Sequence, residues 1–124
     1  MQAPHESHWK SLKRILRYIR GTVQFGIQYS SGGTPRLIGF TDSDWAGDPD
    51  DWKSTAGYVF SLGSSPITWS SKKQSVISLS STEAEYRATV RASQEVMWLR
   101  QILSEFGFEQ QLPTTLWCDN QSAI

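Results

Sequence analysis

The sequence predicts a single α/β domain whose sheet combines antiparallel and parallel strands. Short apolar runs between residues 36 and 71 are joined by turns rich in Gly and Ser, so we expect these runs to be antiparallel neighbours. Residues 83–106 carry apolar side chains every three or four positions, as an amphipathic helix does. A last apolar run, residues 114–119, follows that helix and can pair in parallel through a right-handed crossover.

An amphipathic helix is predicted over residues 7–20, with Ser7 as its cap and Gly21 at its end. Its apolar stripe either packs on the core beneath a solvated charged face, or its positive face contacts phosphates. The stripe consists of Trp9, Leu12, Ile15, Leu16 and Ile19, and the positive face of Lys10, Lys13, Arg14, Arg17 and Arg20.

The predicted sheet elements follow this helix. Residues 22–30 alternate between apolar and polar, which predicts an extra, half-buried strand, and a turn at residues 31–33 leads to the next strand at 36–42. We expect further strands at 55–62 and 66–71, then a basic turn at 72–74 and a strand-like run at 76–79. Gly107 is expected to end the long helix.

Composition excludes several classes of protein. Twelve Lys and Arg balance twelve Asp and Glu, so net charge indicates no partner, and a single cysteine, Cys118, suits a reducing intracellular compartment. No apolar run approaches the roughly 20 residues that cross a bilayer, so we expect no membrane partner. The two histidines, His5 and His8, lie outside the predicted core, which leaves no plausible catalytic triad.

Three carboxylates come from three predicted elements. Asp42 and Asp119 each follow an apolar strand at its carboxyl end, where open α/β sheets bind ligands, and Glu85 lies in the first turn of the long helix. If they converge, their mutual repulsion requires a divalent cation. Oxygen ligands without His or Cys favour Mg²⁺ or Mn²⁺, and two such ions can activate water for phosphodiester cleavage.

Each carboxylate also has a purely structural interpretation. Glu85 stands three residues after Thr82, and Glu83 three after Ser80, so either glutamate fits a capping box. Asp119 suits the N-cap of a following helix. The loop aspartates are simplest as turn formers, and a calcium-binding loop starting at Asp42 fails for want of ligands at the required positions. These loop aspartates are Asp48, Asp50 and Asp51.

Five segments together resemble one known family. The strings GFTDSDWAGD, KSTAGY, ISLSSTEAEY and CDNQSAI are similar to the ribonuclease H domain of copia-type retrotransposon Pol polyproteins, and HWKSLKRILRYIRGT resembles the stretch that joins reverse transcriptase to that domain. In order, these strings cover residues 39–48, 53–58, 77–86, 118–124 and 8–22.

The resemblance implies an α/β fold with a ribonuclease H-like mixed sheet, made of an antiparallel meander, a long helix and a parallel strand. It assigns residues 1–33 to a connection segment after reverse transcriptase and 34–124 to a ribonuclease H-like domain. The family's fourth metal-binding aspartate, last strand and remaining helices have no counterpart here, so we expect a C-terminally incomplete domain. Asp42, Glu85 and Asp119 match the family's catalytic, metal-binding carboxylates.

The implied activity is Mg²⁺- or Mn²⁺-dependent hydrolysis of the RNA strand of an RNA/DNA hybrid, beside the reverse transcriptase of the same polyprotein. The alternative is a non-catalytic remnant that only binds nucleic acid, which the incomplete domain favours. Contacts to nucleic acid are expected from Lys10, Lys13, Arg14, Arg17, Lys72, Lys73 and Arg87, with Arg91 beside them.

Overall fold

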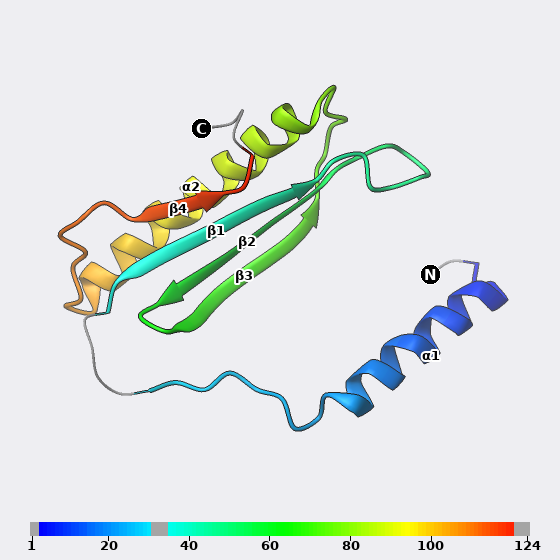
Figure 1. Ribbon diagram of the computed structural model, residues 1–124, viewed down its shortest axis with the longest axis horizontal. Helices are drawn as coiled ribbons and strands as arrows, with labels where there is room; N and C mark the ends of the chain where they lie inside the picture. Colours follow the sequence, from blue (N-terminus) through cyan, green and yellow to red (C-terminus); the bar gives the residue numbers. More distant parts are fainter. Residues whose placement is uncertain (1–2, 31–34, 121–124) are drawn as a thin grey trace.

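The computed structural model describes residues 3–30 and 35–120, and its elements follow one another as helix, three strands, helix and strand (Figure 1). They are α1 (Glu6–Gly21), β1 (Leu37–Asp44), β2 (Thr55–Leu62), β3 (Ser65–Lys73), α2 (Ser81–Glu105) and β4 (Thr115–Cys118). Neither helix is long and apolar enough to cross a membrane in these described ranges.

The four strands form one mixed sheet in the order β3-β2-β1-β4. β1 pairs with β2, and β2 with β3, in antiparallel fashion, whereas β4 runs parallel to β1. The predicted meander, long helix and parallel strand are therefore confirmed, with β1 extending two residues beyond its expected end. Because β1 and β4 run the same way, their carboxyl ends lie at the same edge of the sheet.

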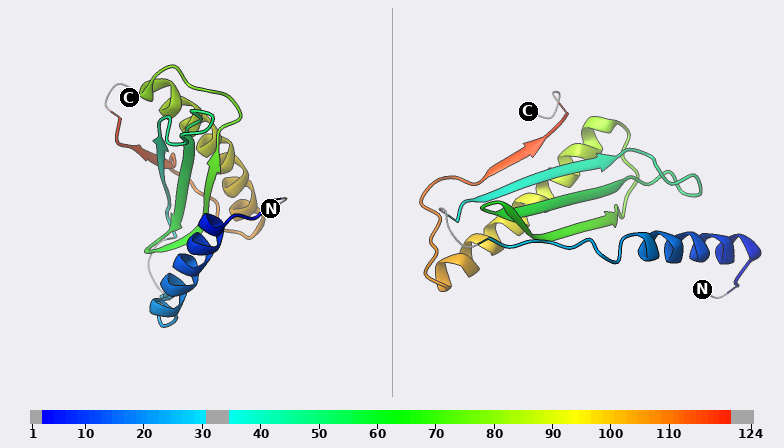
Figure 2. Two further views of the ribbon diagram at one scale, coloured as in Figure 1. Left: turned by 90° about the vertical axis from the view of Figure 1, so that its right-hand side faces the viewer. Right: turned by 60° about the horizontal axis from the view of Figure 1, so that its bottom comes forward.

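Helix α2 crosses one face of the sheet (Figure 2) and supplies three of the five buried residues of the core cluster. Small side chains at Ala84, Ala88 and Ala92 are fully or almost fully buried, which lets the helix lie close to the strands. Farther along, Leu99 and Leu103 pack with two buried residues of the sheet, Leu37 and Phe60.

The opposite face of the sheet carries a row of exposed apolar side chains. Trp69, Val59, Phe40 and Trp117 are consecutive partners in the strand register, one from each strand. Each is exposed, in contrast to the buried side chains that alternate with them in β1.

The loop between α2 and β4 is fixed by side chains rather than by regular structure. Arg100 donates hydrogen bonds to the Leu112 carbonyl at 2.8 Å and to Thr114 Oγ1 at 3.0 Å. Gln110 accepts from the backbone N–H of Leu37 at 2.9 Å and donates to the Pro35 carbonyl at 2.8 Å. These contacts hold the start of β4 beside the start of β1.

The predicted strand at residues 22–30 is wrong, because this segment forms no ladder with the described strands. It lies extended near the start of β3, where Ser65 Oγ donates to the Gln28 carbonyl at 2.7 Å and Tyr29 Oη donates to the Pro66 carbonyl at 3.0 Å. Side-chain alternation alone provides no partner for backbone N–H and C=O groups. The turn predicted at 31–33 lies outside the described residues.

Two further local predictions are corrected. Lys72 and Lys73 end β3 instead of forming a turn, and residues 76–79 form a loop instead of a strand. The loop is held by buried polar contacts of Gln74 and Ser78, which compete with strand pairing.

Helix α1 forms nearly as predicted, but its cap and its packing differ. His5, not Ser7, is the N-cap residue, and its backbone N–H donates to His8 Nδ1 at 3.1 Å. No residue of α1 is buried. The apolar stripe is therefore exposed instead of packed on the core, because α1 lies apart from both the sheet and α2 (Figure 1).

Removing the cap of α2 should destabilise the domain. Ser80 Oγ accepts a hydrogen bond from the Glu83 backbone N–H at 3.1 Å, so Ser80→Ala leaves that N–H without its partner. We expect a loss of about 1 kcal/mol in the free energy of unfolding, measured by urea denaturation. Ser81→Ala, one residue later and exposed, is the matched control and should change stability by less than about 0.5 kcal/mol.

Candidate metal centre

Two of the three predicted carboxylates lie where β1 and β4 end. In the parallel register Thr41 is the partner of Cys118, so Asp42 and Asp119 come next at the same level of the two strands. Both side chains are exposed. The sequence-based expectation that these strands are neighbours is therefore confirmed.

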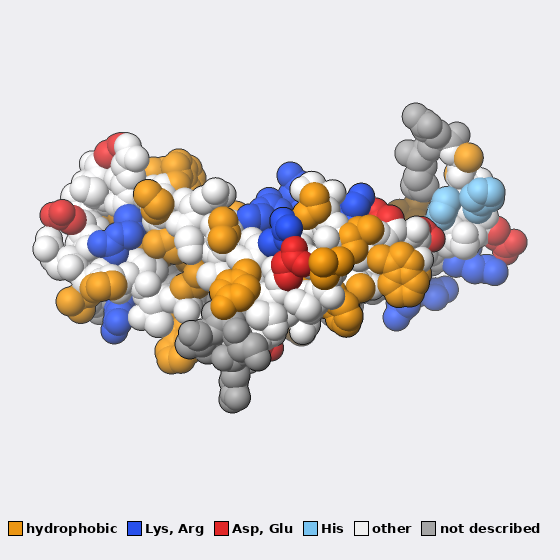
Figure 3. Space-filling view, turned by 90° about the horizontal axis from the view of Figure 1, so that it is seen from above, with side chains coloured by type: hydrophobic (Ala, Val, Ile, Leu, Met, Phe, Trp, Pro, Cys, Tyr) orange, Lys and Arg blue, Asp and Glu red, His pale blue; other side chains and the backbone are white. Residues whose placement is uncertain are grey.

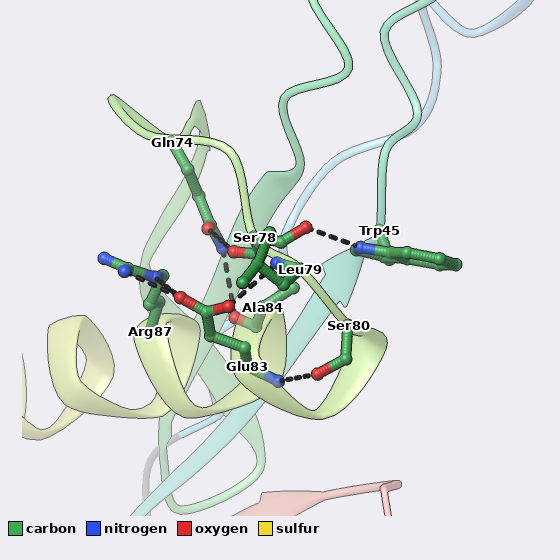
Figure 4. Close-up of polar contacts among 8 residues, drawn as sticks. All are labelled: Trp45, Gln74, Ser78, Leu79, Ser80, Glu83, Ala84 and Arg87. Atoms are coloured by element: carbon green, nitrogen blue, oxygen red, sulfur yellow. Dashed lines mark hydrogen bonds and ion pairs between the residues drawn. The ribbon is translucent and has the colours of Figure 1, made fainter.

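The third carboxylate, Glu85, is free of the capping role that the sequence left open. The cap of α2 uses Ser80 with Glu83, whose Oε2 accepts from the Leu79 backbone N–H at 2.8 Å (Figure 4). Glu83 also accepts from Arg87 Nη2 at 2.8 Å. Glu83 thus serves the helix start, and Glu85 turns to the sheet instead.

Glu85 reaches the strand ends from α2. Its Oε1 accepts from the Ser43 backbone N–H at 3.2 Å, and its Oε2 lies 3.6 Å from Cys118 Sγ. The same Ser43 N–H donates to Asp42 Oδ1 at 2.8 Å, so one donor links the two carboxylates. Ligand atoms of Glu85, Cys118 and Asp119 all lie within 4.8 Å of one another, and among the described residues Asp42 is not part of this close group.

Burial and like charge together disfavour an ionised Glu85. Its side chain is only 5% exposed. Burial is the main cause that raises the pKa of Glu85, the Ser43 N–H and the Cys118 thiol oppose it, and the charges of Asp42 and Asp119 raise it further. This carboxyl group would therefore gain from a cation placed between the three acids.

A buried polar network supports the Ser43 side of the site. Gln74 Nε2 donates to Ser43 Oγ at 3.2 Å and to the Ala84 carbonyl at 3.0 Å. Ser78 Oγ donates to Gln74 Oε1 at 3.0 Å, and Trp45 Nε1 donates to the Ser78 carbonyl at 3.0 Å (Figure 4). The network joins β1, the 74–80 loop and α2, so it fixes the position of Ser43 relative to Glu85.

The donor set fits a small divalent cation. Asp42, Glu85 and Asp119 offer hard carboxylate oxygens, which Mg²⁺ and Mn²⁺ prefer. Cys118 adds a softer sulfur donor beside them. Sequence reasoning did not include Ser43, Gln74 or Cys118, although Ser43 and Cys118 directly adjoin the predicted aspartates.

The loop aspartates are used locally. Asp48 Oδ1 accepts from the Asp50 backbone N–H at 2.8 Å, as a turn former does. Lys73 forms ion pairs with Asp48 and Asp51, and the distance to Asp51 is 3.0 Å. Lys73 and Lys53 lower the pKa of Asp51 to about 2. The capping role considered for Asp119 involves residues beyond the described ones.

The residues predicted to contact nucleic acid fall on two separate surfaces (Figure 3). Four belong to α1, where Lys10 pairs with Glu6 at 3.3 Å and the ammonium of Lys13 lies 5.1 Å from the centre of the Trp9 ring. The other three lie around the end of β3 and the start of α2. On α1 these residues are Lys10, Lys13, Arg14 and Arg17, and beside the sheet they are Lys72, Lys73 and Arg87.

Known proteins with similar sequences include transposon polyproteins. The chain is 47% identical over 123 residues to the retrovirus-related Pol polyprotein from transposon RE2 of Arabidopsis thaliana, a match that covers 99% of the chain and 8% of that polyprotein. It is 43% identical over 124 residues to the corresponding protein from transposon TNT 1-94 of Nicotiana tabacum, covering 100% of the chain and 9% of that polyprotein. The chain thus spans less than a tenth of these relatives.

A shorter relative is matched over most of its length. Secreted RxLR effector protein 161 of Plasmopara viticola is 47% identical over 96 residues, which are 77% of the chain and 68% of that protein. No family model and no solved structure matches the chain. The chain belongs to a family of homologous segments that occurs within copia-type retrotransposon Pol polyproteins and makes up most of that effector protein.

Proposed function

We propose that this segment has a ribonuclease H-like fold and that, with bound Mg²⁺ or Mn²⁺, it hydrolyses the RNA strand of RNA/DNA hybrids. The observation that carries the proposal is the approach of Glu85 on α2 to the ends of β1 and β4. Its carboxylate lies within 4.8 Å of ligand atoms of Cys118 and Asp119, and the Ser43 N–H links it to Asp42. Burial is the main cause that raises the pKa of Glu85, and the charges of Asp42 and Asp119 raise it further. A glutamate that served only as a helix cap would have no reason to turn to the strand ends in this way.

Some residues of the chain would bind the cation, and others position those ligands. Asp42, Glu85 and Asp119 would hold the cation, and Ser43 positions two of them through its shared N–H. The bound cation supplies an activated water and stabilises the leaving oxygen. Gln74 donates a hydrogen bond to Ser43 Oγ, which would keep Ser43, and the acids that accept from its N–H, in position before a cation binds.

The relation to a longer polyprotein supports a division of the segment into two parts. Residues 1–33 would connect to a preceding reverse transcriptase, and residues 34–124 would form the ribonuclease H-like part. The exposed apolar stripe of α1 supports this assignment, because such a face requires a partner that the described residues do not provide. The reverse transcriptase of the same polyprotein is the proposed partner.

A non-catalytic nucleic-acid-binding segment is the second candidate. The observation that favours it is the set of Lys and Arg residues on α1, a helix that lies apart from the ends of β1 and β4 (Figure 1). Binding without cleavage would depend on salt and not on a divalent cation.

Cleavage of a labelled hybrid separates the two candidates. With Mg²⁺ or Mn²⁺ we expect the RNA strand of an RNA/DNA hybrid to be cut, and EDTA to prevent it. Asp42→Asn should abolish cleavage, because it removes a negative ligand from the site. The reaction is followed by electrophoresis of end-labelled RNA, with hybrid binding measured in parallel.

Asp44→Asn is the matched control, since Asp44 is exposed on the same strand two residues away and does not belong to the three acids. This variant should cleave the RNA strand of the hybrid at the same rate as the unaltered chain. Salt-sensitive hybrid binding with no cleavage in either divalent ion would instead establish the non-catalytic candidate.

A further inference from the structure

We propose that a basic groove between the end of β3 and the N-terminal half of α2 binds an unpaired stretch of nucleic acid. The inference deepens the proposed function and rests on it in one respect. Where an RNA/DNA hybrid bound at the three acids ends, its unpaired strand would continue into this groove. The binding itself requires neither the divalent cation nor the three acids.

The groove encloses about 640 Å³ and is formed by two parts of the chain. One wall is the end of β3 with the loop that follows, and the other is a stripe of α2 at helical spacing. Its lining residues include Lys72, Val76, Tyr86, Arg87, Val90 and Arg91.

Charge selects an anionic occupant. Lys72, Lys73, Arg87 and Arg91 line the groove, with Glu83 as the one carboxylate among its lining residues, although the whole chain has no net charge. Lys73 is partly neutralised by Asp48 and Asp51, and Arg87 by Glu83. Among the described residues, no carboxylate lies within ion-pairing distance of Lys72 or Arg91, so these two are best suited to contact phosphates.

Exposed apolar and aromatic side chains select single-stranded over duplex nucleic acid. The Tyr86 ring is 52% exposed, and Val76 and Val90 are exposed beside it in the same groove. A duplex offers phosphates to such a surface but keeps its bases stacked inside. An unpaired strand offers bases that stack on an aromatic ring while its phosphates meet the cations.

The groove and the proposed metal centre share a wall. Gln74 lines the groove and donates to Ser43 Oγ and to the Ala84 carbonyl, while Ser43 N–H donates to Glu85. On α2, Tyr86 lines the groove and the adjacent Glu85 faces the acids. A strand held in the groove would therefore lie next to the metal centre, on the other side of this wall.

Binding of fluorescent oligo-dT, followed by anisotropy in EDTA, tests the inference without cleavage. Tyr86→Ala should weaken binding at least about fivefold, because stacking of one base is lost. The double variant Lys72→Gln/Arg91→Gln should lower the slope of log affinity against log salt by about 1.4, as expected for two lost phosphate contacts. Neither effect needs the cation, so failure here is distinct from failure of Asp42→Asn.

Arg36→Gln/Lys53→Gln removes the same charge from positions outside both the groove and α1, and should leave the affinity within about twofold, with the Tyr86 effect intact. Circular dichroism checks that each variant is folded. Equal weakening by the control pair would overturn the inference, since binding would then follow overall charge alone. So would a Tyr86→Ala effect of the same size on duplex DNA, or full competition by polyglutamate, which would identify an acidic polypeptide as the occupant.

Discussion

Glu85→Gln is expected to make the cation-free protein more stable at pH 7 while reducing hybrid cleavage at least about a hundredfold. The gain in stability arises because burial disfavours the charged carboxylate and the charges of Asp42 and Asp119 add to this cost, whereas glutamine carries no charge. Glutamine can still accept the Ser43 N–H through its Oε1. The loss of cleavage follows from removing a ligand worth several kcal/mol, where each 1.4 kcal/mol is about tenfold in rate.

The direction of the pH dependence follows from the raised pKa of Glu85. A folded-state pKa above the unfolded value means that the stability contributed by this group is fully present below about pH 4.5. It is lost as the pH rises through the folded-state pKa. In EDTA, the difference in Tm between Glu85→Gln and the unaltered chain should therefore grow between pH 4.5 and pH 8.

Added Mg²⁺ or Mn²⁺ should reverse this ranking. The cation stabilises the unaltered chain by an amount that grows with the logarithm of its concentration above Kd, and it leaves Glu85→Gln almost unchanged. Glu83→Gln is a suitable control, because Glu83 accepts the Leu79 N–H at the start of α2 and is not one of the three acids. This variant should be less stable than the unaltered chain, but its Tm should still rise when the cation is added. An unaltered chain whose Tm does not change with either ion at millimolar concentration would remove the case for the metal centre.

Phe60→Ala should cost about 3–5 kcal/mol in the free energy of unfolding, the largest effect on stability expected from a single side chain here. Phe60 is 0% exposed and packs among Leu37, Ala92, Leu99 and Leu103 between β2 and α2. Removing its ring leaves a cavity that the strand and helix backbones on either side cannot close. The loss is measured by urea denaturation, and it is large enough to unfold a marginally stable domain.

Phe40→Ala provides the same chemical change on the neighbouring strand. Phe40 pairs in the strand register with Val59, the residue that precedes Phe60 in β2. Its side chain lies on the face of the sheet that α2 does not cover, and Phe40 is 50% exposed. It should cost less than half as much. Phe60→Leu keeps most of the buried volume and should remain folded with a smaller loss, so the comparison survives if Phe60→Ala does not fold. Equal costs for Phe40→Ala and Phe60→Ala would contradict the assignment of the core to the α2 side.

The periodic spacing of apolar residues along the sequence was sufficient to predict the sheet and the long helix. Strands β1 and β2 and helix α2 have buried residues at the spacing that the pattern indicates. The same pattern failed at residues 22–30, because a strand needs a partner edge as well as alternating side chains. It also gave the bounds of α1 to within one residue but not its packing, since periodicity identifies an apolar face and not what covers it.

The site was predictable to the extent that it depends on strand ends. Asp42 and Asp119 follow from the rule that ligands lie beyond the carboxyl ends of strands. The pattern alone left Glu83 and Glu85 equivalent, since each follows a Ser or Thr by three residues, and the resemblance chose Glu85. The observed hydrogen bond from the Glu83 backbone to Ser80 assigns the cap to Glu83 and so agrees with that choice. Gln74 and Cys118 depend on contacts between distant segments, which no local pattern contains.

The pairing of β1 with β4 has a consequence for the order of folding. β1 obtains its antiparallel partner from the next strand in the sequence, but its parallel partner comes from the far end of the chain, after the whole of α2. Distant pairings form slowly because a long loop must close first. The meander and helix can thus assemble during synthesis before Asp119 arrives, so the proposed metal centre can form only after the whole of α2 has been made.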